Sequence, residues 1–297
     1  MRRGRTRVES PSLARTGRLL VACPDKPGIV AAVTGFLYHR GANVTTLQEY
    51  STDPEGGRFF MRVEFTVSTP TELDAGFEAA FEATVAGRYE MAWRLSRAAH
   101  RKRTVVLVSK HDHALLELLW RHARGELHAD ITAVISNHED AAAHAAEFGV
   151  PFHHVPVDKG DKGPAEARIL ELLGDDTELV VLARYMQILS ADFVRHFPSR
   201  IINIHHSFLP AFVGANPYHQ AHVRGVKLIG ATAHYVTADL DQGPIIEQDV
   251  TRVSHRHSPE ELVRLGRSIE REVLARAVQW HLEDRVLVHD GKTVAFT

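Results

Sequence analysis

The sequence predicts an α/β protein with two domains. Three observations support this class. The chain has 297 residues, which is long for a single hydrophobic core. Up to about residue 97, the pattern of apolar side chains reads as strands and helices in the order βαββαβ. From residue 104 onward, near-continuous apolar strands alternate with helices, as in an open, mostly parallel sheet that is buried on both faces.

Residues 17–97 are expected to form a ferredoxin-like βαββαβ sandwich. In the strands apolar and polar residues alternate, whereas the helices carry the longer period of an amphipathic helix. The expected strands are 18–23, 43–52, 57–67 and 89–96, and the expected helices are 29–41 and 71–87.

Residues 98–103 are expected to be a short basic linker, and residues 104–297 a second domain with a Rossmann-like, mostly parallel sheet. The expected strands are 104–109, 131–136, 152–157, 178–184 and 200–206, with a final pair at 285–289 and 293–296. The expected helices are 112–123, 139–148, 164–173, 190–197 and 259–282. Because sites in such sheets form at the carboxyl ends of the strands, polar residues there are candidates for function.

The composition is that of an ordinary globular protein. The 35 Lys and Arg residues against 37 Asp and Glu give a formal charge of -2, which argues against nucleic acid or an acidic membrane as a partner. No apolar run approaches the roughly 18 residues of a membrane-spanning helix. The single cysteine, Cys23, excludes an internal disulfide and suits a cytoplasmic location. Residues 1–16 are expected to be a basic, disordered tail, in which Glu9 and Pro11 disfavour a mitochondrial presequence.

Polar side chains gather at the end of the expected strand 200–206. Asn203 and His205 are two residues apart, so they project to the same side of a strand. An amide and an imidazole side by side can donate hydrogen bonds to an oxygen that becomes negative, and the imidazole can also move a proton. The pair therefore suits carbonyl chemistry, although a strand that runs into a polar loop accounts for either residue alone.

A second group of polar residues follows the expected strand 231–236. Asp239 and Asp241 stand in a turn that Gly243 closes. A carboxylate here could orient His205 or activate water. The alternative is that both acids only cap a turn, and spacing alone does not select Asp241.

Two stretches resemble a known family. INIHHSFLPAFVGANPYHQA (202–221) and GATAHYVTADLDQGPII (230–246) are similar to the 10-formyltetrahydrofolate-using formyltransferases and hydrolases. The Asn-x-His, Leu-Pro, His-Gln-Ala and Leu-Asp-x-Gly-Pro elements match in order. The resemblance implies Asn203, His205 and Asp241 as the catalytic trio, with no metal and no cofactor, since 10-formyltetrahydrofolate is the substrate.

The resemblance extends upstream to LARYMQILSADFV (182–194), which is similar to the family segment that lines the folate pteridine pocket. It implies apolar walls and main-chain hydrogen bonds for the substrate. Without the resemblance, the segment is only the end of a buried strand. The residues expected to bind substrate are Met186, Ile188, Leu189, His234, Asp239 and Gly243.

Water is the expected acceptor of the formyl group. Residues 109–124 contain no glycine with which to build a phosphate cradle, which argues against an acceptor of the glycinamide ribonucleotide type. After helix 259–282 and the short strands, no room is left for the tRNA-binding domain of a methionyl-tRNA formyltransferase. Hydrolysis would supply formate and tetrahydrofolate to one-carbon and purine metabolism. The alternatives are transfer to an amine and a catalytically silent amino-acid sensor.

Residues 23–44 resemble the opening of an ACT domain, a module that often binds small amino acids at a paired interface. The resemblance implies an effector site near Asp25, Gly28 and Asn43, and pairing of chains into a homo-oligomer. An ordinary turn before a helix accounts equally well for Asp25 and Gly28. The identity of the effector stays open.

The twenty histidines raise the question of a metal. Closely spaced histidines could share one, but no HExxH-type helix is present. We therefore expect no catalytic metal. The closely spaced pairs are His111 and His113, His153 and His154, and His255 and His257. The roles of His206, His219 and the loop 212–220 stay open.

Overall fold

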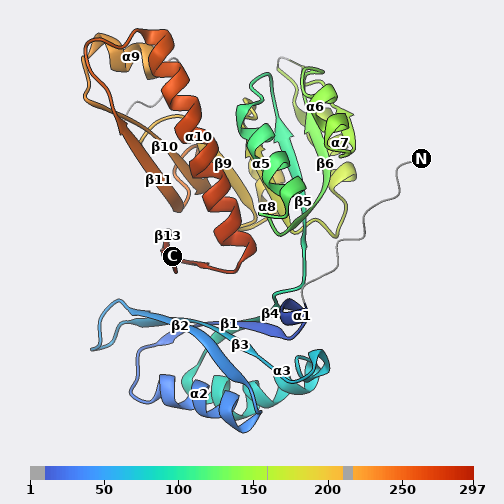
Figure 1. Ribbon diagram of the computed structural model, residues 1–297, viewed down its shortest axis with the longest axis vertical. Helices are drawn as coiled ribbons and strands as arrows, with labels where there is room; N and C mark the ends of the chain where they lie inside the picture. The colour runs from blue at the N-terminus through green and yellow to red at the C-terminus, as the bar shows by residue number, and fades with distance from the viewer. Residues whose placement is uncertain (1–10, 159, 210–216) are drawn as a thin grey trace. The chain divides into compact units, whose positions relative to one another are not determined.

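The computed structural model describes residues 11–158, 160–209 and 217–297, and its contacts divide the chain into two compact units (Figure 1). The boundary between the units falls after Arg101, inside the expected linker. The end of the chain differs from the expectation. Residues 283–287 and 294–297 belong to the first unit, although the sequence pattern had placed them in the second.

The first unit is built on a four-stranded antiparallel sheet with the strand order β2-β3-β1-β4. This arrangement confirms the expected βαββαβ order. Its main elements are β1 (Thr16–Pro24), α2 (Ile29–His39), β2 (Asn43–Ser51), β3 (Arg58–Thr66), α3 (Ala75–Phe81) and β4 (Ala92–Arg97).

The expected tail over residues 1–16 is wrong in its last part. Pro11–Ala14 forms the short helix α1, and β1 already begins at Thr16. The Thr16 hydroxyl donates to the Ser12 carbonyl at 2.8 Å, which ties the helix to the strand. Residues 1–10 lie outside the described part of the chain.

The expected helix 71–87 is broken into several pieces. The Asp74 carboxylate accepts hydrogen bonds from the backbone N–H groups of Gly76 and Phe77. It acts as an N-cap, so α3 begins only at Ala75. The other pieces are a 3₁₀ turn η1 (Pro70–Glu72), a π-helical turn η2 (Glu82–Ala86) and the short helix α4 (Gly87–Tyr89).

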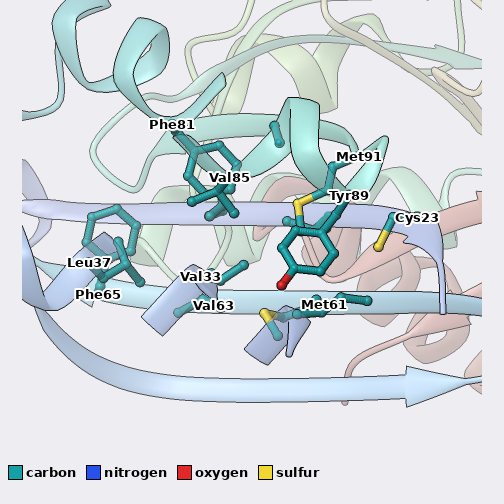
Figure 2. Close-up of a cluster of buried hydrophobic side chains, with 14 of the residues drawn as sticks. Cys23, Val33, Leu37, Met61, Val63, Phe65, Phe81, Val85, Tyr89 and Met91 are labelled. Carbon is teal, nitrogen blue, oxygen red and sulfur yellow. The ribbon is translucent and has the colours of Figure 1, made fainter. Parts of the chain in front are cut away.

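The core of the first unit lies between the sheet and the helices (Figure 2). Strand alternation sends every second residue of β1 and β3 toward the helices, where these side chains are fully buried. Cys23 is one of them, so its thiol is buried and free. The other labelled side chains of this core are Val33, Leu37, Met61, Val63, Phe65, Phe81, Val85, Tyr89 and Met91.

The second unit contains a seven-stranded sheet with the strand order β11-β10-β9-β8-β5-β6-β7. Strands β5 to β9 run parallel, and β10 and β11 are antiparallel. The strands are β5 (Lys102–Val108), β6 (Ala129–Ser136), β7 (Phe152–His154), β8 (Leu179–Ala183), β9 (Ile201–His205), β10 (Leu228–Tyr235) and β11 (Ile245–Arg252). The helices are α5 (His113–Arg124), α6 (Ala142–Glu147), α7 (Gly163–Leu173), α8 (Ala191–Arg195), α9 (Pro217–Val223) and α10 (Pro259–Leu282).

Helices cover this sheet on both faces. Side chains of α7 and α8 form one core cluster with alternate residues of β5, β8 and β9. Helix α10 packs along β10 and β11 and beside α5 (Figure 1). The parallel strands are buried on both sides and therefore read as continuous apolar runs, as predicted. The end of the chain forms a separate pair, β12 (Val286–His289) and β13 (Lys292–Ala295).

The sequence pattern missed β11. In this edge strand only Ile246 is buried and most of the other positions are polar, so no regular apolar alternation marks it. Among the described helices, none is both long and apolar enough to cross a membrane.

Candidate active site

A cavity of about 250 Å³ lies at the carboxyl ends of β8 and β9 in the second unit. In the sheet, β5 lies between β6 and β8. The chain runs from β5 outward through β6 and β7 on one side and then returns to form β8 on the other side, so the strand order reverses at β5. Ligands bind beside such switch points in open α/β sheets. The cavity is lined by Leu182, Arg184–Leu189, Asn203–His206, His234, Val236–Ala238, Leu240 and Asp241.

Strand pairing brings Asn203 beside His234. The two residues are direct partners in the antiparallel register of β9 and β10. The Asn203 amide Nδ2 lies 3.2 Å from His234 Nε2, and His234 Nδ1 lies 2.9 Å from the Tyr235 carbonyl oxygen. Because a carbonyl can only accept, His234 Nδ1 carries the hydrogen. The contact at Nε2 fixes the orientation of the Asn203 amide.

His205 and Asp241 form the second pair in the cavity. His205 Nδ1 lies 3.3 Å from Asp241 Oδ2, and His234 Nε2 lies 3.7 Å from Oδ1. The hydrogen bond from His205, and then the contact with His234, hold the pKa of Asp241 well below its usual range. An ionised Asp241 keeps the hydrogen of His205 on Nδ1. The other ring nitrogen, Nε2, is buried and has no hydrogen-bond partner among the described residues.

The turn between β10 and β11 has an unusual backbone conformation. Asp241 adopts a left-handed conformation with φ 56°, which only a few residue types such as Asn and Asp tolerate readily. At Gly243, a Cβ atom would lie 1.7 Å from the Tyr235 carbonyl oxygen. Gly243 is therefore required by close approach of the backbone, and the same carbonyl holds the His234 ring.

The segment after β8 forms the mouth of the cavity. Met186 is 54% exposed and Ile188 is 60% exposed, so both present apolar surface to solvent, and Leu189 is partly buried. Two main-chain groups of this segment already have partners. The Met186 N–H donates to Ser109 Oγ at 2.9 Å, and Lys162 donates to the Ile188 carbonyl at 2.8 Å.

The structure brings most of the predicted site residues together, but not all of them. Asp239 and Gly243 do not line the cavity; Asp239 is exposed, and its carbonyl accepts from the Thr237 hydroxyl. His206 lines the cavity, whereas His219 is exposed on α9. Residues 212–216 of the loop 212–220 lie outside the described residues.

The possible effector residues lie in the first unit. Asp25 accepts a hydrogen bond from the Ser51 hydroxyl, and Gly28 has φ 93° before the start of α2. A Cβ atom at Gly28 would lie 3.0 Å from the Tyr89 hydroxyl. Asn43 begins β2, is exposed, and pairs in register with Thr66.

Sequence reasoning missed two charged residues beside the cavity. Arg184 directly follows β8 and lines the cavity with φ 63°, and Glu270 on α10 lies 3.4 Å from its Nε. Glu270 is 1% exposed. One signal could have revealed it: Glu270 falls on the apolar stripe of α10 that also contains Gly266 and Val273.

The described residues contain no group of three or more His, Cys, Asp or Glu side chains arranged to hold a metal ion. The polar groups that line the cavity include the Asn203 amide, the imidazoles of His205, His206 and His234, the Arg184 guanidinium and the Asp241 carboxylate. The arrangement can donate hydrogen bonds to a carbonyl oxygen and transfer a proton.

Comparisons with known proteins agree with this description. The formyl transferase family matches residues 102–278, and the ACT domain family matches residues 17–75. The formyltetrahydrofolate deformylase of Bacillus subtilis is 56% identical over 281 residues, which cover 94% of this chain and 93% of the relative. The crystal structure of a formyltetrahydrofolate deformylase from Pseudomonas syringae matches with a TM-score of 0.91 and 53% identity over 95% of both chains.

The second unit also resembles enzymes that transfer the formyl group. A glycinamide ribonucleotide transformylase from Symbiobacterium toebii matches with a TM-score of 0.62 and 30% identity, covering 67% of this chain and 95% of that chain. A formyl transferase domain preceded by an ACT domain defines the class of this protein. Within that class, the chain belongs to the formyltetrahydrofolate deformylase family.

Proposed function

We propose that the chain hydrolyses 10-formyltetrahydrofolate with water to formate and tetrahydrofolate. The observation that carries this proposal is His205, which lines the cavity beside Asn203: its Nε2 is buried without a partner among the described residues, and an ionised Asp241 lies against its Nδ1. The products would supply formate and free tetrahydrofolate to one-carbon and purine metabolism.

Asn203 is the proposed donor to the formyl oxygen. One hydrogen of its amide is bound to His234. The second hydrogen is available for the oxygen that becomes negative when the formyl carbon turns tetrahedral. Removing one such donor costs on the order of 2.7 to 4 kcal/mol in the barrier. The apolar mouth formed by Met186 and Ile188 would receive the pteridine ring.

His205 is the proposed proton carrier. Its Nε2 lone pair takes a proton from water as the water oxygen bonds to the formyl carbon. Asp241 stabilises the resulting imidazolium through Nδ1–H. When the intermediate collapses, the bond from carbon to N10 breaks and N10 takes the proton from Nε2. His205 is thus the base, and Asp241 positions its ring.

The test is turnover without any amine acceptor. The purified protein is incubated with 10-formyltetrahydrofolate and a chelator, and formate and tetrahydrofolate are followed. We expect steady release of both, and a loss of roughly a hundredfold or more in Asp241→Asn, the range of a general acid–base contribution. Asparagine is chosen because it tolerates the left-handed backbone of Asp241.

A matched control separates charge from backbone effects. Asp290 also has a left-handed backbone, with φ 47°, and its side chain is 82% exposed. Asp290→Asn should retain the activity of the unaltered chain. Turnover only after addition of an amine would indicate a transferase, and no turnover under any condition would favour the amino-acid sensor.

For the first unit, we propose a small amino-acid effector near Asp25, Gly28 and Asn43, and association of chains into a homo-oligomer. Two features support this proposal. Gly28 lies at a tight, left-handed turn before α2, where a ligand can approach the backbone closely. Strands β2 and β4 are the edges of their sheet, and such edges can pair with a second chain. The buried, free thiol of Cys23 supports a cytoplasmic location.

A further inference from the structure

A buried polar cluster stands beside the proposed catalytic residues, and the mechanism does not use it. We call His113, Arg184, Tyr218 and Glu270 the Glu270 cluster. Glu270 Oε2 lies 2.8 Å from His113 Nε2 and 3.4 Å from Arg184 Nε, and Oε1 accepts from the Tyr218 hydroxyl at 2.7 Å. The four side chains come from α5, the segment after β8, α9 and α10. A carboxylate as deeply buried as Glu270 needs these partners.

The Glu270 cluster backs one wall of the cavity. Arg184 and His206 line the cavity itself. The His206 ring centroid lies 5.1 Å from that of His205 and 6.3 Å from that of Tyr218. His206 therefore stands between the proposed catalytic imidazole and the cluster.

Part of the cavity lining is apolar and exposed to solvent. Met186, Ile188 and Leu240 are all more than half exposed there. A flat pteridine ring enters most favourably across such a surface, because it buries apolar area. A folate on this apolar part of the lining leaves the polar part at Arg184 and His206 for a second substrate.

Within the described part of the chain, the space beyond His206 is nearly filled. It holds a second cavity of about 30 Å³, lined by His206–Phe208, Tyr218, Ala221 and Leu228–Gly230. That volume is about right for a water molecule and far too small for an acceptor such as an aminosugar phosphate. Water can therefore be accommodated there, whereas an amine substrate cannot.

The packing of Tyr218 is close. A Cβ atom on Gly266 would lie 2.0 Å from the Tyr218 hydroxyl oxygen, so the ring lies directly against α10. One turn further along that helix, Glu270 accepts the hydroxyl hydrogen. Arg184 is held with a left-handed backbone, which is unfavourable for arginine and requires support from its surroundings. Both observations indicate that the wall is rigid.

The same fold also serves transfer reactions. The solved structures that resemble the second unit include a glycinamide ribonucleotide transformylase, an enzyme whose name specifies an amine as the acceptor. Because a fold by itself does not determine the reaction, the choice between water and an amine has to arise from side chains around the nucleophile.

We infer that the Glu270 cluster is a specificity element: it fills the acceptor side of the cavity and thereby restricts the nucleophile to water. This inference rests on the proposed hydrolase function. Opening the cluster should let a small amine compete with water. In that case the carbon–N10 bond breaks, a bond from carbon to the amine nitrogen forms, and N10 takes the proton that the amine loses.

The experiment measures how the formyl group partitions between water and an added amine. The purified protein is incubated with 10-formyltetrahydrofolate and either hydroxylamine or glycinamide, and formate and formylated amine are quantified after subtraction of the enzyme-free reaction. The unaltered chain should yield formate alone. Tyr218→Ala should yield formylated amine at a ratio to formate at least tenfold above the detection limit of the assay, with the larger effect for hydroxylamine because it is smaller.

Three further variants control for folding. Tyr218→Phe keeps the ring and should leave the ratio as in the unaltered chain. Phe197→Ala opens a similarly buried aromatic site beside α8 that does not line the cavity, and should yield no formylated amine. Arg184→Gly suits the left-handed backbone at that position, removes the side chain from the wall and should raise the ratio, which covers the case in which Tyr218→Ala does not fold.

The outcomes separate two kinds of failure. If the unaltered chain formylates the amine as readily as the variants, or if folded Tyr218→Ala and Arg184→Gly yield formate alone, the Glu270 cluster does not select water. If the unaltered chain consumes 10-formyltetrahydrofolate only after an amine is added, and then forms formylated amine rather than formate, the proposed hydrolase function itself is wrong.

Discussion

At the residue scale, two neighbouring histidines have different tasks because their surroundings differ. His205 has an ionised carboxylate on Nδ1 and an unpartnered Nε2 within the described structure. The pKa of His206 is lowered to about 4, mainly by burial and then by the positive charges of Arg184 and His205. The first ring is thus suited to moving protons, and the second remains neutral near neutral pH.

The partly buried His206 should make stability depend on pH in a defined range. Its pKa is about 4 in the folded chain and near 6.5 in the unfolded chain, so the unfolded state binds the proton first. The stabilisation is fully present above about pH 6.5 and is lost as the pH falls toward 4, with a total of up to about 3 kcal/mol.

The measurement is the free energy of unfolding in urea between pH 4 and 8, for the unaltered chain and for His206→Gln. Over this range the unaltered chain should lose more stability than the variant. Asp241 does not interfere, because its lowered pKa affects stability only near and below its ordinary value of 3.8. Parallel curves for the two proteins would contradict the assignment.

At the element scale, the turn between β10 and β11 sets the geometry of the site. Asp241 has a strained backbone in this turn, and Gly243 lies directly against the Tyr235 carbonyl. That carbonyl also binds His234, which in turn orients Asn203. The backbone of one turn is therefore linked to two side chains on β9 and β10.

Gly243→Ala should disrupt this arrangement. The added Cβ would overlap the Tyr235 carbonyl oxygen, so the turn must shift. We expect a loss of about 1 to 3 kcal/mol in the free energy of unfolding. We also expect kcat to fall at least tenfold, because His234 and Asp241 move with the turn. Urea unfolding and formate release measure the two effects.

Gly35→Ala is the matched control. Gly35 lies inside α2 with an ordinary backbone, and no atom would lie within 4 Å of its added Cβ. Alanine should stabilise this helix by up to about 1 kcal/mol and leave kcat unchanged. Gly243→Ala with unaltered kcat would show that the turn does not position the site.

The elements that the sequence pattern predicted are those with a clear period. Buried strands such as β8 read as apolar runs, and α10 has the predicted bounds 259–282. The period of 2 also placed Asn203 and His205 on one side of β9. The helix over 71–87 failed because the local cap at Asp74 interrupts it, a contact that periodicity does not contain.

The Glu270 cluster could not be predicted for a different reason. Tyr218 and Glu270 are 52 positions apart, and His113 and Glu270 are 157 apart. Neither spacing follows from a strand or helix period, because the packing of α5 and α9 against α10 brings these residues together. In the sequence of one protein, such long-range contacts leave only weak signals, such as a glutamate on the apolar stripe of a helix.

At the scale of the whole molecule, the end of the chain belongs to the first unit because buried charges hold it there. Arg62 on β3 is 2% exposed and donates to the carbonyl oxygens of Glu283 and Asp284. The Asp284 carboxylate, also 2% exposed, lies 2.9 Å from Arg94 and accepts from the Ser96 hydroxyl at 2.6 Å. Arg62 and Asp284 are 222 positions apart, so the sequence pattern assigned this segment to the other domain.

Asp284→Asn tests whether these charges stabilise the first unit. Asparagine tolerates the left-handed backbone at this position, where φ is 54°, so the change removes charge without new strain. It leaves Ser96 and Arg94 with a weaker acceptor. Because Arg94 is 48% exposed and can turn to water, we expect a loss of about 1 to 3 kcal/mol in the free energy of unfolding in urea.

Asp290→Asn gives the same chemical change at an exposed site with a similar backbone. Its effect should stay within about 0.5 kcal/mol, as for other surface substitutions. Equal effects of the two variants would mean that the carboxylate of Asp284 contributes no more than an exposed one. A loss confined to Asp284→Asn would instead show that a charge near the end of the chain stabilises a sheet formed by its beginning.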